Sequence, residues 1–148
     1  MKSIFLIFIS FFMLLSCSNS DDSFTPQNIT PILIGKGSLM GSEGINPQNL
    51  VINNQQDWNN IINLIDQFRL NNFTETTNVD FNTYQLIAVF DEVYGSPTYQ
   101  INISSIVENL NNITVTVEKI YKPSIASVMT QEFHIVKIPK SSKPVIFQ

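Results

Sequence analysis

Three positions in this chain carry the residue types from which catalytic or metal sites are built. They are the single cysteine Cys17, the single histidine His134 and the adjacent carboxylates Asp91 and Glu92. One histidine excludes a zinc site with two imidazoles, and no Gly-x-Ser-x-Gly segment supplies an activated serine. Asp91 and Glu92 are expected on opposite faces of a strand, because neighbouring side chains in a strand alternate. The residues predict no catalytic centre, no metal and no cofactor, and His134 is expected to be a surface or hydrogen-bonded structural residue.

Cys17 follows a segment with the layout of an export signal. Lys2 supplies one positive charge, residues 4–15 are apolar apart from Ser10, and Ser16 precedes the cysteine. Such a run is too short to span the bilayer as a helix, which takes about 20 residues. The arrangement resembles a bacterial lipoprotein signal, in which residues 1–16 are removed and Cys17 is acylated. The open alternative is a thiol in an ordinary secretory leader or a short membrane anchor.

Two or more acyl chains hold a protein stably on a membrane, so Cys17 predicts a membrane-tethered module of the cell envelope. Residues 17–31 hold little to bury and predict a flexible linker. Asp21 and Asp22 in this linker either resemble a signal for the outer face of the outer membrane or only keep the linker soluble. Without Lys2 the chain keeps seven basic against twelve acidic residues, a net charge of about −5. That sign argues against a nucleic-acid partner.

The remaining chain, residues 32–148, predicts one domain. Ile32–Ile34 is expected to form a short strand that feeds a glycine-rich loop between Gly35 and Gly44. A phosphate-binding loop would need Lys and then Ser or Thr after its last glycine. Ile45 and Asn46 follow Gly44 instead, so the spacing excludes that function.

An amphipathic helix is predicted from Asn54 to Leu70. One face carries Trp58, Ile61, Ile62, Ile65 and Phe68 at helical spacing. Asn54 is the expected N-cap, and Asp57 is expected to hydrogen-bond back to it as in a capping box. Trp58 is expected to anchor this face in a core.

Strands are predicted for the rest of the domain. Leu86–Phe90 is continuously apolar, which is typical of a strand covered on both faces. The alternating segments that begin at Tyr99 and Ile113 predict a hairpin whose turn lies at Glu108–Asn112. Phe133–Ile138 and Val145–Phe147 complete the set. The sequence therefore predicts an α+β domain, with a mainly antiparallel β-sheet and a single amphipathic helix packed on it.

Four segments, in this order, resemble the C-terminal domain family of the protease complex subunit PrcB. They are Asn54–Trp58, Val79–Phe81 before the strand at Leu86, Gly95–Tyr99 leading into Gln100–Ile103, and Thr130–Pro139. The resemblance covers roughly residues 50–147. It implies a non-catalytic domain that binds or stabilises a partner protein, such as a surface protease, and it brings no catalytic motif.

The best candidate contact for a partner is the turn with Tyr94, Gly95, Pro97 and Tyr99. Rigid aromatic side chains beside a fixed turn are common anchors at interfaces. The alternative is that both tyrosines only cap the core. A second class of function is also open, namely a small-ligand or glycan binder or an envelope hydrolase with a site that carries no recognisable motif.

Replacing Cys17 with serine should leave a folded domain that no longer stays on the membrane, because acylation needs the thiol. The measurement is fractionation of cell envelopes after a high-salt wash, with folding checked by circular dichroism. Retention of the Cys17→Ser protein in the membrane fraction, with its leader cut elsewhere, would show that the tether is not a lipid on Cys17.

Overall fold

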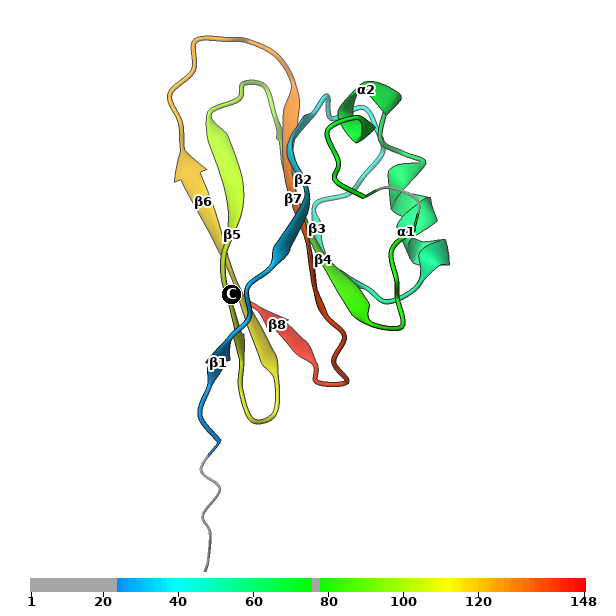
Figure 1. The fold of residues 1–148 in the computed structure, drawn as a ribbon. Coiled ribbons are helices and arrows are strands. Elements are labelled where there is room, and N and C mark those ends of the chain that lie inside the picture. The colour runs from blue at the N-terminus through cyan, green and yellow to red at the C-terminus, as the bar shows by residue number, and fades with distance from the viewer. Residues whose placement is uncertain (1–23, 76–77) are drawn as a thin grey trace, which may run out of the picture.

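The computed structural model describes residues 24–75 and 78–148 and shows two packed, mainly antiparallel sheets with helices on one side (Figure 1). Residues 1–16 and Cys17 lie outside the described residues. Sheet A has the strand order β1-β5-β6-β8, and sheet B the order β2-β7-β4-β3. The mainly antiparallel β prediction is confirmed, although the one expected sheet is two. All neighbouring strands are antiparallel except β6 and β8, which run parallel.

The strand bounds are as follows. Sheet A consists of β1 (Gln27–Asn28), β5 (Tyr99–Glu108), β6 (Ile113–Tyr121) and β8 (Val145–Phe147), and sheet B of β2 (Ile32–Leu39), β7 (Thr130–Pro139), β4 (Tyr84–Tyr94) and β3 (Gln48–Ile52). The predicted hairpin is β5–β6, and the predicted central, late and last strands are β4, β7 and β8. The short strand β3 has no counterpart in the sequence-based prediction.

Sheet B is covered on both faces, as the apolar run in β4 predicts. Leu86, Ala88 and Phe90 face the helices in one core cluster. Ile87 and Val89 face sheet A in a second cluster. Because side chains alternate along a strand, a run without a polar residue needs a layer on each side, and the molecule has three layers.

The helical segment differs from the prediction of one helix. It forms two, α1 (Gln55–Ile62) and α2 (Gln67–Leu70). Asn54 caps α1 by accepting from the Asp57 N–H at 2.9 Å, as expected. Asp66 starts α2 by accepting from the Arg69 N–H at 3.1 Å, a bond that a short acidic side chain makes at a helix start. The break turns Phe68 off the buried face, and its side chain is 79% exposed.

The N-terminal part of the domain also differs from the prediction. Secondary structure begins before Ile32, because Gln27 and Asn28, in the segment expected to be a linker, pair with the end of β5. The glycines after Ile34 do not start a loop, since β2 continues to Leu39. Gly35 allows this path, because a Cβ there would lie 2.6 Å from the Phe73 ring.

Trp58→Ala should lower the free energy of unfolding by about 3–5 kcal/mol, as the loss of a large buried aromatic does. Trp58 is 0% exposed and its ring stacks on Phe73 at a centroid distance of 6.3 Å. Phe68→Ala is the matched control, and its effect should stay within about 0.5 kcal/mol because that ring is exposed. Chemical denaturation measures both. Equal midpoints for Trp58→Ala and wild type would contradict the packing.

Candidate functional site

The two tyrosines predicted as a contact lie together at the end of the sandwich where β4 passes into β5. The rings of Tyr94 and Tyr99 are 5.4 Å apart, and Tyr121 on β6 meets Tyr99 edge-on at 5.7 Å. The Lys119 ammonium lies over both rings, 4.4 Å from the centroid of Tyr94 and 5.1 Å from that of Tyr99. Cation–π contacts of this kind hold rings in place, so the cluster is a fixed part of the fold with exposed edges.

The turn between these tyrosines does not depend on glycine, although Gly95 lies in it. Gly95 has no positive φ, and a Cβ added to it would meet nothing within 4 Å. A glycine is needed instead at position 41, beside β4. Gly41 has a φ of +75°, and a Cβ added to it would lie 2.5 Å from the Val93 side chain. Pro97 and Tyr99 line a neighbouring cleft.

A β-bulge in β4 brings an acidic side chain to this cluster. The register with β7 shifts between Phe90 and Val93. Asp91 is buried and pairs with the Lys119 ammonium at 3.1 Å, while Glu92 is exposed and accepts from the Tyr94 hydroxyl at 3.0 Å. The two carboxylates therefore differ in burial, but both belong to one network through Lys119 and Tyr94, because the bulge interrupts the alternation expected for them. Burial opposes the charge on Lys119, but hydrogen bonds from it to Tyr94 and Asp91 outweigh this and raise its pKa.

The cleft beside the tyrosines has a volume of about 300 Å³ and lies between β2 and β5. Its lining comprises Gly37, Ser38, Pro97, Tyr99, Gln100, Lys122, Pro123, Ser124 and Glu132. Glu132 is buried and accepts a hydrogen bond from the Ser38 hydroxyl. Burial raises the pKa of Glu132 above its ordinary value of 4.5. A carboxylate, hydroxyls and an ammonium in one cleft can hold a polar molecule.

His134 is a buried, hydrogen-bonded structural residue, which is one of the two roles expected for it; the other was a surface position. Its Nδ1 accepts from the Ile103 N–H at 2.9 Å, which ties β7 of one sheet to β5 of the other. Burial, together with the Lys36 ammonium, lowers its pKa from 6.5 to about 4. The Ser38 hydroxyl donates to Glu132 and not to this imidazole, so the two residues do not form a serine–histidine pair.

Four exposed apolar side chains belong to two segments at the same end of the sandwich (Figure 1). Met40 follows β2, and Ile125, Val128 and Met129 belong to the loop from β6 to β7; each is more than half exposed. We refer to these four as the apolar tip. The last paired residues of β2 and β7 are Leu39 and Gln131. Met40, directly after β2, and Met129, directly before β7, therefore lie at neighbouring strand ends. Exposed apolar groups gathered in this way mark interaction surfaces.

Two other features are absent from residues 24–75 and 78–148. No cluster there has three or more His, Cys, Asp or Glu side chains placed to hold a metal ion. Nor is any helix in those ranges long and apolar enough to cross a membrane.

No family model, curated protein or solved structure matches this chain.

The sequence pointed to Tyr94, Gly95, Pro97 and Tyr99, but it did not point to the polar groups beside them. Glu132, Ser38 and Lys119 come from three different strands, and a bulge in β4 adds Asp91. The one available signal was the polar pair Gln131-Glu132 directly before Phe133, where the mainly apolar part of the strand begins.

The buried neutral imidazole of His134 predicts a pH dependence of stability. Its pKa in the fold is below 6.5, so the unfolded chain takes up a proton first as the pH falls. From pH 6.5 to 4 the wild type should lose up to about 3 kcal/mol of unfolding free energy relative to His134→Gln. Denaturation of both proteins at each pH measures this, and the comparison cancels the opposite contribution of Glu132. A difference that does not change with pH would contradict the burial of the ring.

Proposed function

We propose that this protein is a lipid-anchored, non-catalytic binding module of the bacterial cell envelope that holds a partner protein. The observation that carries the proposal is the apolar tip, whose four side chains are all more than half exposed. Apolar area of this kind is stabilised when another surface covers it, at roughly 25 cal/mol per Å². Tyr94 of the tyrosine cluster pairs with Thr130, the residue after Met129, and the cluster would add aromatic anchors, as interface hot spots commonly have.

The position of the tip fits a tethered protein. The chain enters the fold at β1, at the lower end in Figure 1, and the β6–β7 loop lies at the opposite, upper end. An acyl group on Cys17 would hold the β1 end toward the membrane. The tip would then face away from the bilayer, where a partner protein can reach it.

The partner we propose is a protein of the envelope, such as a surface protease, and the membrane we propose is the outer membrane. Support comes from the resemblance of residues 50–147 to the PrcB C-terminal domain family and from Asp21 and Asp22 after the cysteine. The net negative charge is the reason to propose a protein partner over a nucleic acid.

A second candidate function has its own observation. The cleft with Glu132, Ser38 and Tyr99 has polar groups and an aromatic edge in about 300 Å³. Such a lining suits a glycan fragment or another small polar ligand. Thermal-shift screening of wild type and Glu132→Gln against glycans separates the candidates. A stabilisation that is lost in Glu132→Gln would favour the ligand-binding function.

Ile125→Ser combined with Met129→Ser should abolish capture of the partner and leave folding unchanged, because both side chains are exposed. The measurement is a pull-down from detergent-solubilised envelope, with the captured protein identified by mass spectrometry and unfolding midpoints compared. Leu110→Ser is the matched control, since it removes an exposed apolar group in the turn between β5 and β6, at the opposite end of the sandwich from the tip (Figure 1). If all three proteins capture the same partner equally, the tip is not the contact surface.

A further inference from the structure

The N-terminal part of the described chain lies at the same end of the sandwich as the turn between β5 and β6 (Figure 1). β1 pairs antiparallel with the last residues of β5, Val107 and Glu108. Followed toward its N-terminus, the chain therefore runs in the direction of β5, which leads to the turn at residues 109–112. The chain leaves the fold here, and we refer to this end, formed by the turn and Phe24, as the exit end.

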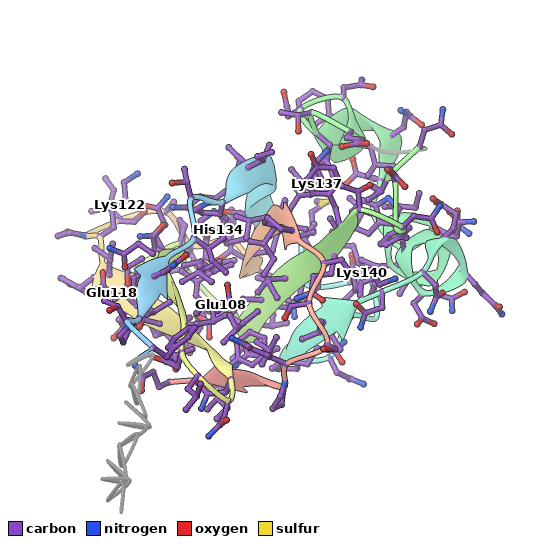
Figure 2. All side chains as sticks on the ribbon, turned by 60° about the horizontal axis from the view of Figure 1, so that its bottom comes forward. Glu108, Glu118, Lys122, His134, Lys137 and Lys140 are labelled. Carbon is purple, nitrogen blue, oxygen red and sulfur yellow. The ribbon has the colours of Figure 1, made fainter. Side chains whose placement is uncertain are left out.

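Contacts of one lysine hold Phe24 beside the turn. The Lys143 ammonium lies 4.6 Å from the centroid of the Phe24 ring. The same ammonium pairs with Glu108 at 2.8 Å and donates to Asn109 O at 2.8 Å. Figure 2 turns this end toward the viewer and labels Glu108 on it. Of the residues expected to form a linker, only residues 17–23 are left to span the distance between the fold and an anchor on Cys17.

The turn at the exit end presents one leucine. The Asn109 N–H donates to Asn112 O at 2.8 Å, and the Asn109 side chain donates to Asn112 Oδ1 at 2.8 Å. Leu110 lies between these two residues and is 62% exposed. Phe24 is also exposed, as is Ile146 on β8, the strand that pairs with the start of β6. The hydrogen bonds close the turn, so Leu110 keeps its exposed position.

The length of the tether limits which end of the molecule can rest on a membrane. Seven residues, 17–23, precede Phe24, and seven residues span at most about 23–25 Å. The ten residues of β5 span about 33 Å. If the apolar tip rested on the bilayer with β5 along the membrane normal, Phe24 would lie about 33 Å above it, beyond the reach of an anchor on Cys17. The exit end stays within that reach.

We propose that the exit end is a membrane-contact surface, on which Leu110 enters the boundary between lipid headgroups and acyl chains. This inference rests on the proposed lipid anchor at Cys17. Apolar side chains are stabilised at that boundary. One leucine is too little to bind a free protein, but a short tether keeps this surface at roughly millimolar local concentration near the bilayer. A weak contact is therefore enough to orient the domain.

The charges at this end favour uncharged lipid as the partner. Glu108 balances the Lys143 ammonium, so the contact does not require anionic headgroups. With Leu110 on the bilayer and β5 along the membrane normal, the apolar tip would lie about 33 Å or more from the headgroups. The contact would thus hold the tip where a partner protein can reach it.

Partition of a singly acylated protein tests the contribution of Leu110. The mature chain, residues 17–148, has Cys17 as its only thiol, so a thiol-reactive myristoyl chain can be coupled to it. One such chain binds a membrane only weakly and reversibly, so a contact made by the protein adds measurably. Leu110→Ser should partition into phosphatidylcholine vesicles about tenfold less than wild type. Ile125→Ser, at the opposite end, is the matched control and should partition like wild type.

Equal partition of wild type and Leu110→Ser would overturn the proposal, and so would an equal loss in Ile125→Ser. Unfolding midpoints of the three proteins check that folding is unchanged. Because the acyl chain is coupled chemically, the result does not depend on acylation in the cell, which fractionation of Cys17→Ser tests separately. Failure of this contact and failure of the lipid anchor are therefore distinguishable.

Quenching by brominated lipids tests which end faces the bilayer. Leu110→Trp and Ile125→Trp each add one exposed indole to the acylated chain, and the buried Trp58 gives both the same background. Bromine atoms in the upper acyl chains should quench the added fluorescence of Leu110→Trp and leave that of Ile125→Trp unchanged, because the second indole lies about 33 Å or more from the bilayer. Equal quenching of the two variants, or stronger quenching of Ile125→Trp, would overturn the proposal.

Discussion

The central strand β4 sets the architecture, because its side chains from Gln85 to Asp91 are buried on both faces. An apolar strand in the middle of a sheet needs one covering layer on each side. Sheet A supplies one of these layers, and the helical segment around Trp58 supplies the other. The order of elements along the chain then follows, since β3 and the helices precede β4 and the hairpin β5–β6 follows it.

At the bulge near the end of β4, the buried side chains change from apolar to polar. Where the register with β7 shifts, Asp91 is buried beside Lys119, and the Gln131 side chain donates to Asp91 O and Ile45 O, each at 2.9 Å. Bulges re-aim side chains near the ends of sheets. The tyrosine cluster, the cleft of Glu132 and the apolar tip lie at this same end of the sandwich, while β1 lies at the other (Figure 1).

The sequence allowed the prediction of elements with a strong local pattern, and those without one were missed. The alternation after Tyr99 and the apolar run at Leu86 identified the hairpin and the central strand. The division into two sheets was missed, because alternation shows that a face is buried but not which layer covers it. Five residues of β3 show too little pattern, and the helix break depends on Asp66 acting as a cap. The cleft was missed because its lining comes from segments that are far apart in the sequence, namely β2, the start of β5, the β6–β7 loop and β7.

The unpaired strand edges explain several features that otherwise look unrelated. An exposed edge invites pairing with another chain, so folded proteins cover or blunt it. On β5 the edge is covered by β1 at one end and by the His134 imidazole at Ile103. On β6 the parallel strand β8 covers the first half. His134 therefore accepts the hydrogen bond of the Ile103 N–H, and burial lowers its pKa so that the neutral ring keeps Nδ1 as an acceptor. By the same accounting the backbone donors of Lys119 and Tyr121 are an exception, because within residues 24–75 and 78–148 no strand pairs with this half of β6.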